Sequence, residues 1–338
     1  MMSRITGWFF VICMLASTSI NPAFLSCHVS QNVPVLLFGS YAPQWQGLSH
    51  TLNTSDIPCV LGRFRNGEVS VEVKESTENK DVVVIQSVFT HEGLMELLLV
   101  IDALKRDGCK RVTACLPYLG YMRQDKRVYA GTPISARLLV KILESAGCDR
   151  FIVCDLHAKQ IEGFFDRPVR HISAMPLFEE DIRQRFGEKD HVVIVSPDSG
   201  GLHRARHLAK RLKVALAVVD KYRKRPGQSE VLQILGDVAG KTCVIVDDMV
   251  DSGGTLMNAA TALKALGARE VHCYCTHGVL SHHAVDNIAK SAVDSLTLSD
   301  SLPVDSSGQK LRFLSVASLV AQEIMQSTAS PQENTEST

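Results

Sequence analysis

Short apolar runs alternate with amphipathic segments along the chain from residue 33 onward. The apolar runs are rich in β-branched residues, which favours strands. Strands are predicted at residues 33–38, 82–86, 111–116, 150–154, 191–195, 215–219, 242–246, 271–275 and 296–298. Apolar residues at helical spacing predict helices at residues 94–105, 134–146, 202–212 and 256–266. Strands that are apolar on both faces and separated by helices are typical of parallel sheets, so we expect an α/β fold with mainly parallel sheets flanked by helices.

This progression of strands and helices occurs twice, which indicates two similar domains. We place them at residues 33–175 and 176–311, after an N-terminal extension at residues 1–32. A last helix is expected at residues 312–326, packed against the first domain. Residues 327–338 are rich in Ser, Thr, Gln and Glu, which is typical of a disordered tail.

The amino-acid composition is typical of a globular protein, and the net charge is too small to create a strong electric field. Hydrophobic residues make up 45% of the 338 residues and charged residues 21%. Lys plus Arg and Asp plus Glu both number 36, so we expect neither nucleic acid nor a membrane as a partner. The ten cysteines are scattered, without a Cys-x-x-Cys pair or a zinc-ligand spacing, which predicts buried, reduced thiols.

The most informative stretch is Val-Ile-Val-Asp-Asp-Met-Val-Asp-Ser-Gly-Gly-Thr at residues 244–255. Its glycines let backbone N–H groups approach a phosphate at the positive end of the following helix, and Thr255 adds a hydroxyl donor. Acids at the end of a buried strand are suited to accept hydrogen bonds from ribose hydroxyls. An ordinary strand–turn–helix joint capped by Asp is the alternative, but the spacing is narrow. The stretch therefore predicts a sugar-phosphate site.

This motif resembles the phosphoribosyl-diphosphate-binding signature of class I phosphoribosyltransferase-type folds. Taken alone, it leaves two classes of enzyme open. One consists of the transferases that consume phosphoribosyl diphosphate, and the other of the kinase that makes it.

Three basic segments carry candidate chemistry and also have ordinary explanations. Residues 63–69 form a turn between strands, with Gly67 as the expected positive-φ residue, and alone this is a hairpin turn with exposed charges. Residues 118–127 interleave aromatic with basic side chains, which suits an adenine and a triphosphate, although a solvated basic loop has the same composition. Residues 221–227 form a cationic loop, either an ordinary surface loop or one that closes on a transferring phosphoryl group.

Two further segments place acids and a histidine where strands end. Residues 155–158, Asp-Leu-His-Ala, follow a strand at the position where ligands bind in open α/β sheets. His157 is a candidate ligand there, and a structural histidine is the alternative. Residues 196–201, Ser-Pro-Asp-Ser-Gly-Gly, precede a helix. Asp198 is either the cap of that helix or a ligand for Mg²⁺, which takes most of its other ligands from water and phosphate.

In combination and in this order, the segments resemble ribose-phosphate pyrophosphokinases, also called phosphoribosyl-diphosphate synthetases. The resemblance runs from about residue 35 to about residue 326. Besides the signature, it rests on Gly-Arg-Phe-x-x-Gly-Glu-Val at residues 62–69, Gly-Tyr-x-Arg-Gln-Asp at 120–125, and Asp-Leu-His-Ala with Gln-Ile-Glu-Gly-Phe-Phe at 155–165. Ordinary phosphoribosyltransferases share only the signature.

The resemblance implies two phosphoribosyltransferase-like domains and a transfer of the diphosphoryl group of MgATP to the 1-hydroxyl of ribose 5-phosphate. The products are phosphoribosyl diphosphate, for nucleotide biosynthesis, and AMP. Mg²⁺ is the implied cofactor, and a dimer-based hexamer is the implied homo-oligomer. Ribose 5-phosphate would bind at Asp247, Asp248, Asp251, Ser252, Gly253, Gly254 and Thr255. ATP would bind at Arg123 and Gln124 and, from a neighbouring subunit, at Phe64, Asn66, Gly67 and Glu68. The implied metal positions are His157 and Asp198, and the implied catalytic cations are Lys221 and Arg223.

Three departures from the family pattern bear on these implications. Asn66 stands where the family usually has Asp, which changes an acceptor near the adenine into an amide. Tyr222 replaces a more usual Arg between the two loop cations. Residues 127–133 are shorter and less basic than the family's common form, and that stretch is linked to phosphate activation and ADP inhibition.

Two alternatives compete with the kinase. A catalytically silent, regulatory relative would have lost some of Lys221, Arg223, His157 and Asp251, and all four are present. A nucleobase phosphoribosyltransferase would lack the segments at residues 63–69 and 120–125 and would not need two equal domains.

The N-terminus points to a different compartment from the rest of the chain. Residues 1–27 have an early Arg4, an apolar core at residues 8–16 and then small and polar residues, which is typical of a secretory signal peptide. The alternatives are a start codon upstream of the true one and an extension without a targeting role. Because ATP and reduced thiols belong inside the cell, we expect a cytoplasmic protein and no functional signal.

Overall fold

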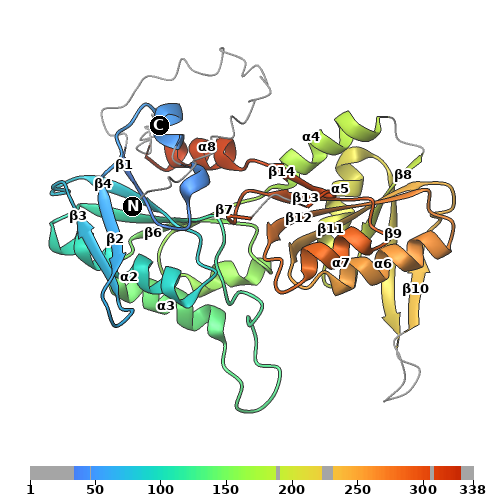
Figure 1. Cartoon of the computed structure of the whole chain (residues 1–338), viewed down its shortest axis with the longest axis horizontal. Coiled ribbons are helices and arrows are strands. Elements are labelled where there is room, and N and C mark those ends of the chain that lie inside the picture. Colours follow the sequence, from blue (N-terminus) through green and yellow to red (C-terminus); the bar gives the residue numbers. More distant parts are fainter. Residues whose placement is uncertain (1–33, 46, 188–190, 223–230, 305–307, 329–338) are drawn as a thin grey trace, which may run out of the picture. The chain divides into compact units, whose positions relative to one another are not determined.

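The computed structural model describes residues 34–45, 47–187, 191–222, 231–304 and 308–328. These residues form two large sheets and one separate hairpin (Figure 1). The first sheet has the strand order β1 (Val35–Phe38), β4 (Asp81–Ile85), β5 (Arg111–Leu116), β6 (Arg150–Cys154) and β7 (Val169–Ile172). All neighbours in it are parallel. The hairpin consists of β2 (Cys59–Arg63) and β3 (Val69–Val73).

The second sheet is parallel except at one edge, where β10 pairs antiparallel to β9. Its strand order is β10 (Val231–Leu235), β9 (Ala215–Tyr222), β8 (Val192–Ser196), β11 (Thr242–Val250), β12 (Glu270–Gly278), β13 (Ser295–Ser299) and β14 (Leu311–Leu314). The chain thus contains the helix-flanked parallel sheets that the apolar pattern predicts.

Helices cover both faces of each sheet. The longer α-helices are α2 (His91–Arg106), α3 (Ser135–Ala146), α4 (Met175–Phe186), α5 (Leu202–Leu212), α6 (Gly254–Ala265) and α8 (Ala317–Thr328). The shorter α-helices are α1 (Leu48–Leu52) and α7 (Ala284–Lys290). Two 3-10 helices are η2 (Pro43–Trp45) and η3 (Lys159–Phe164). Local signals set the ends of α2 and α3: Thr90 caps the first through the N–H of Gly93, and Gly147, at φ 113°, ends the second.

Alternate residues of each strand enter different core clusters, because successive side chains point to opposite faces of a sheet. In β8, Ile194 belongs to a cluster that also contains Ile85 of the first sheet and Ile324 of α8. Its neighbour Val195 belongs to a cluster under α6. The two sheets therefore share one hydrophobic core on one face, and the other face of each sheet has its own.

The structure corrects the sequence prediction at the C-terminus. The helix expected at residues 312–326 is instead β14, paired with β13, followed by α8. The apolar residues of β14 complete an edge of the second sheet, and this pairing outweighs their helical spacing. Helix α8 contacts β7 of the first sheet and helix α1, so the last helix packs against the first domain. The sequence patterns also did not predict β7, β10, α1, α4 and α7.

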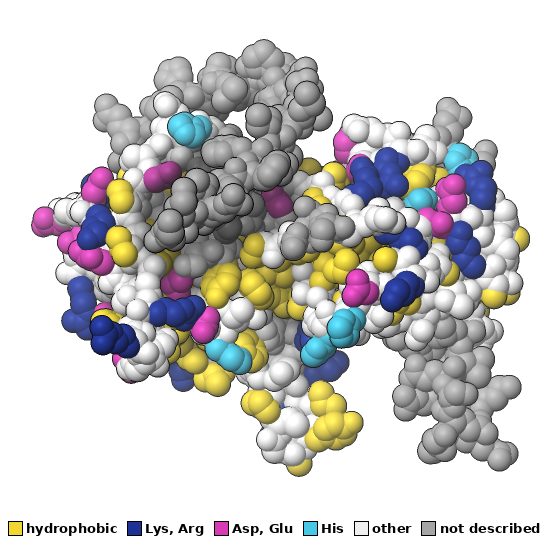
Figure 2. Space-filling view, in the orientation of Figure 1, with side chains coloured by type: hydrophobic (Ala, Val, Ile, Leu, Met, Phe, Trp, Pro, Cys, Tyr) yellow, Lys and Arg dark blue, Asp and Glu magenta, His cyan; other side chains and the backbone are white. Residues whose placement is uncertain are grey.

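The surface agrees with the balanced charge. On the face drawn in Figure 2, acidic and basic side chains are interspersed and do not gather in patches of one sign. Within the described ranges, no helix has the length and apolar character that a membrane span requires.

Candidate active site

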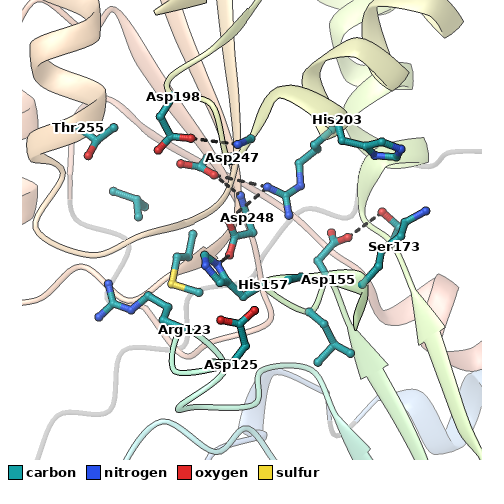
Figure 3. Close-up of a pocket in the computed structure, with 18 of the residues that line it drawn as sticks. Arg123, Asp125, Asp155, His157, Ser173, Asp198, His203, Asp247, Asp248 and Thr255 are labelled. Carbon is teal, nitrogen blue, oxygen red and sulfur yellow. Dashed lines mark hydrogen bonds and ion pairs between the residues drawn. The ribbon is translucent and has the colours of Figure 1, made fainter. Parts of the chain in front are cut away.

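A cavity of about 1290 Å³ lies where the carboxyl ends of β6, β8 and β11 meet (Figure 3). Single small-molecule pockets usually measure about 300–1,000 Å³, so this one has room for two ligands. Its lining joins Arg123 and His157 from the first sheet to Asp198 and the segment 247–255 from the second. The cavity thus brings together four of the sequence segments that were candidates for chemistry.

The two adjacent acids of the signature have different surroundings. Arg204 of α5 lies between them, with its Nη1 3.4 Å from Asp247 Oδ1 and 3.2 Å from Asp248 Oδ1. Asp248 Oδ2 also lies 2.8 Å from His157 Nδ1. The side chain of Asp248 is 5% exposed and that of Asp247 is 19% exposed. Asp248 is therefore occupied by protein partners, and Asp247 is the acid more open to a ligand.

The pKa values of these groups shift apart. Burial, with the negative charge of Asp248 next, raises the pKa of Asp247 above its usual range. Burial also acts to raise the pKa of Asp248, but the hydrogen bond from His157 and the charge of Arg204 outweigh it and leave that pKa lowered. The hydrogen bond to Asp248 raises the pKa of His157 against the effect of burial. Neighbouring acids pushed in opposite directions are typical of a functional site.

The glycine turn after these acids has a backbone geometry that suits an anion. Gly253 has φ 78°, a conformation that glycine adopts without strain, and α6 begins at Gly254. The first N–H groups of a helix have no intrahelical acceptor, so they are available to an anion. Residues 252–255 all line the cavity, and Asp251 Oδ2 lies 2.9 Å from Arg123 Nη2 across it. The turn can therefore bind a phosphate at the cavity wall.

Other predicted residues reach the cavity from separate elements. Asp198, between β8 and α5, accepts a 2.9 Å hydrogen bond from the N–H of Gly201, which is itself the N-cap of α5, so Asp198 fixes the turn before the helix and does not cap it. From the first sheet, Asp125 lines the cavity and accepts a hydrogen bond from Gln160 Nε2 at 2.8 Å. The cavity therefore contains a carboxylate from each of several loops, while the described part of the chain holds no preformed cluster of three or more metal-ligating side chains.

Several predicted site residues do not line this cavity. The turn between β2 and β3 contains Phe64, Asn66, Gly67 and Glu68, and Phe64 is 59% exposed. Gly67 has φ 91°, as predicted. Gln124 is hydrogen-bonded to Ser135 instead of facing the cavity. The backbone of Lys221 pairs with Leu232 in β9–β10, but its side chain and all of Arg223 lie outside the described residues.

The motif analysis missed Arg204, although it lines the cavity and contacts both central acids. It occupies the first turn of α5, where the helix dipole disfavours a cation. A basic residue in the first turn of a helix, three residues after Ser-Pro-Asp-Ser-Gly-Gly, indicates an acidic partner nearby.

Comparisons with known proteins identify the family. Residues 36–147 match the N-terminal domain of ribose phosphate pyrophosphokinase, and residues 168–306 match the phosphoribosyl transferase domain. The ribose-phosphate pyrophosphokinase of Bradyrhizobium diazoefficiens is 46% identical over 289 residues, which cover 84% of this chain and 91% of the relative. The chain belongs to the ribose-phosphate pyrophosphokinase family. The family member from Ralstonia nicotianae is 48% identical over 269 residues, or 78% of this chain and 84% of the relative.

A solved structure of the same family agrees with the fold. The phosphoribosylpyrophosphate synthetase from Mycobacterium smegmatis matches with a TM-score of 0.81 at 37% identity, covering 87% of this chain and 98% of that one. The family and the α/β fold with two phosphoribosyltransferase-like domains, expected from the motifs, are thus confirmed. As a ribose-phosphate pyrophosphokinase family member, the chain is a transferase of nucleotide biosynthesis, and these relatives give no support to a nucleobase phosphoribosyltransferase or a silent relative.

Proposed function

We propose that the protein transfers the diphosphoryl group of MgATP to the 1-hydroxyl of ribose 5-phosphate. The 1-oxygen attacks the β-phosphorus, the bond from that phosphorus to the α,β-bridging oxygen breaks, and AMP leaves with the oxygen. The hydroxyl proton is released, and phosphoribosyl diphosphate is the other product. One observation carries the proposal: a single cavity, large enough for two ligands, places an anion-binding turn beside loops of the other sheet.

Ribose 5-phosphate binds, in this proposal, at the end of β11. The N–H groups at the start of α6 and the hydroxyls of Ser252 and Thr255 hold the 5-phosphate. Asp247 accepts hydrogen bonds from the ribose hydroxyls, which its greater exposure supports. Asp248 has a different task from the one expected, because its buried carboxylate already binds His157 and Arg204. We assign it to orienting those two side chains around the sugar.

ATP approaches from the side of the first sheet. Arg123 reaches the cavity and would contact the phosphates. The hairpin residues Phe64, Asn66, Gly67 and Glu68 do not line the cavity of their own chain. This supports delivery of the adenine site by the hairpin of a neighbouring subunit, as in a dimer-based hexamer. Gln124, held by Ser135 of α3, would contact ATP only after that hydrogen bond opens.

The donor set of the cavity fits Mg²⁺ brought in with the nucleotide. Mg²⁺ prefers one or two carboxylates together with substrate phosphates and water, so the absence of a three-residue cluster among the described side chains agrees with it. Asp198 suits direct binding. Imidazole is a poor partner for this ion, so His157 would act through a metal-bound water or a phosphate oxygen. When bound, the ion neutralises phosphate charge and helps to align the reacting groups.

The remaining positive charge comes from the β9–β10 segment. Lys221 and Arg223 are the proposed catalytic cations, which stabilise the charge that develops on the transferring group. Tyr222 between them carries no charge, which lowers the positive charge of the segment but leaves both proposed catalytic cations in place.

Conversion of ATP and ribose 5-phosphate tests the proposal directly. With Mg²⁺, the purified chain should form AMP and phosphoribosyl diphosphate in equal amounts, and AMP should not form when ribose 5-phosphate is omitted. Unchanged reactants would favour the silent relative, and consumption of phosphoribosyl diphosphate with a nucleobase would favour the transferase. A parallel series with inorganic phosphate measures whether residues 127–133 still support activation.

We also propose that the protein works in the cytoplasm. The described cysteines are free thiols and all but Cys59 are buried, as in a protein kept in a reducing compartment. Expression from Met1 and sequencing of the mature N-terminus tests this, because cleavage near Cys27 would contradict it.

A further inference from the structure

The turn that carries His157 has an uncommon backbone conformation. Asp155, the first residue after β6, has φ 35°, a region that L-residues other than Asn and Asp rarely adopt. Its side chain is buried, and the whole residue is 6% exposed. Such a conformation persists only when the surrounding contacts hold it.

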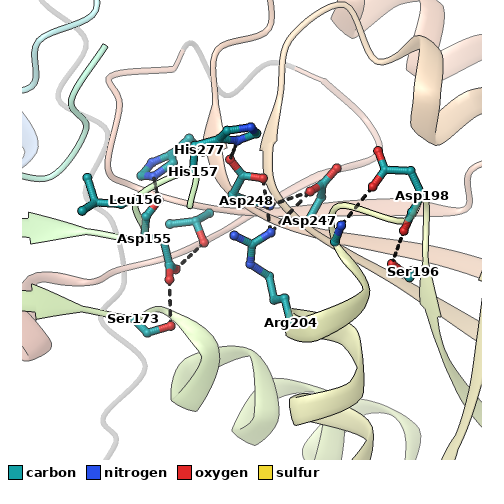
Figure 4. A network of polar contacts seen from close by, with 12 residues as sticks. Asp155, Leu156, His157, Ser173, Ser196, Asp198, Arg204, Asp247, Asp248 and His277 are labelled. Carbon is teal, nitrogen blue, oxygen red and sulfur yellow. Dashed lines mark hydrogen bonds and ion pairs between the residues drawn. The ribbon is translucent and has the colours of Figure 1, made fainter. Parts of the chain in front are cut away.

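Three donors surround the Asp155 carboxylate, and Figure 4 shows the contact with Ser173. Ser173 Oγ donates to Oδ1 at 2.8 Å, and the N–H of Ala174 donates to Oδ2 at 2.9 Å. Thr276 Oγ1 donates to Oδ2 at 2.6 Å. Ser173 and Ala174 follow β7 of the first sheet, whereas Thr276 belongs to β12 of the second. The carboxylate therefore ties the turn to both sheets.

The backbone of the same turn is held as well. His277 Nε2 lies 3.1 Å from the Asp155 carbonyl oxygen, and its Nδ1 lies 2.9 Å from Ser301 Oγ. Because a carbonyl oxygen only accepts, Nε2 carries the proton. On the next residue, the N–H of Leu156 donates to His171 Nε2 at 3.0 Å. The backbone of the two residues that precede His157 is thus held by hydrogen bonds before any ligand binds.

We propose that Asp155 is a positioning residue, which holds His157 against Asp248 and acts on the reaction only through His157. This inference rests on the proposed function. The competing role is direct metal binding, since Asp155 lies two residues from a proposed metal position. A carboxylate offers about four acceptor sites, and three are already taken here by donors whose hydrogens would face a cation. The geometry points to the positioning role.

Two substitutions separate these roles. In Asp155→Asn, the amide oxygen can accept from Ala174 and Thr276, the NH₂ can donate to Ser173, and Asn tolerates positive φ. We expect it to keep kcat within about threefold of the wild type, whereas Asp155→Ala should lower kcat about 10- to 100-fold. If Asn is as damaging as Ala and both need more Mg²⁺ for half-maximal rate, Asp155 is a metal ligand and the proposal is wrong.

A double-mutant cycle with His157→Ala tests whether Asp155 acts through His157. The variant with both Asp155→Ala and His157→Ala should have the kcat of His157→Ala alone. Once the imidazole of His157 is removed, the loss of the residue that positions it should not lower kcat further. Additive losses would overturn the proposal. No AMP from the wild-type chain would overturn the proposed function together with this inference, while additive losses in an active enzyme overturn this inference alone.

Thr276→Val replaces Asp155→Ala in the cycle if the alanine variant does not fold. It removes one donor and keeps the shape, so kcat should fall by about two- to tenfold, and this loss should vanish in the His157→Ala background. Thr297→Val is the matched control. Thr297 is equally buried on the adjacent strand β13, but its hydroxyl contacts Arg312, so kcat should not change. Equal losses in the two threonine variants would contradict the positioning role.

Discussion

The loops that follow β6 and β11 face the same cavity, yet their geometry is set in different ways. After β11, acids, glycine turn and helix start follow each other within residues 247–255, and the positive φ of Gly253 is a local property. After β6, the geometry depends on distant partners: Asp248 lies 91 residues from His157, and Thr276 lies 121 residues from Asp155. One site is encoded by a short motif, and the other is assembled by the fold.

This difference suggests that the two loops have separate roles in the proposed reaction. The β11 loop can hold a sugar phosphate with backbone amides and one open acid. The β6 loop delivers a single imidazole, whose position depends on both sheets. If the division holds, substitutions in the two loops should affect different kinetic constants, and a change outside both should affect turnover without affecting binding.

The largest effect is expected outside both loops, at Lys221 on β9. Lys221→Ala should lower kcat by about 10²–10⁴-fold, because it removes a cation that acts on charge developed only in the transition state. The KM for ribose 5-phosphate should change little. Initial rates over a range of both substrates measure the two constants.

Lys241→Ala is the control for this variant, since Lys241 directly precedes β11, does not line the cavity and pairs with Asp237. Its kcat should match the wild type. The KM of Lys221→Ala for ribose 5-phosphate could instead rise by as large a factor as kcat falls. That result would place Lys221 in the sugar-phosphate site and contradict its assignment to turnover alone.

An intermediate effect is expected from Asp247→Asn in the β11 loop. Asp247→Asn turns one acceptor oxygen into an NH₂ donor, and leaving a ribose hydroxyl without its acceptor costs about 1–3 kcal/mol, so the KM for ribose 5-phosphate should rise about 5- to 100-fold. The KM for ATP should rise much less. Asp237→Asn serves as the control, since Asp237 is a surface acid between β10 and β11 that does not line the cavity. Equal increases in both KM values would show that the β11 loop does not discriminate between the substrates.

The contrast between the loops also explains what the sequence could predict. The fold class, the predicted strands and the glycine turn that lines the cavity were accessible because apolar periodicity and the glycine pattern are local signals. The role of Asp248 was not, because it depends on His157 and Arg204 from other elements. The strand expected at residues 242–246 continues to Val250 because β12 pairs with it beyond the acids. Long-range pairing of this kind leaves no mark in a short window of sequence.

The smallest expected effect concerns the pH dependence of the β6 loop. Burial lowers the pKa of His277 in the folded state, so below about pH 6.5, the usual pKa of histidine, the unfolded chain binds more protons than the folded chain. His277 therefore costs nothing above that pH, and its penalty grows as the pH falls toward the lowered folded value. At pH 5.5 it is at most about 1.4 kcal/mol.

His277→Gln removes this titration, and comparing melting temperatures of the two proteins at pH 7.5 and 5.5 measures it. The wild type should lose up to about 2 °C more than the variant over this interval. Other buried histidines, such as His272, are the same in both proteins and cancel in the difference. His283→Gln, at an exposed position, should follow the wild type at both pH values. Equal losses in the wild type and His277→Gln would mean that His277 accepts a proton in the folded state without cost. The contact between its Nδ1 and Ser301 Oγ would then not require an unprotonated nitrogen, and the contacts that His277 makes with the β6 loop would not be sensitive to pH.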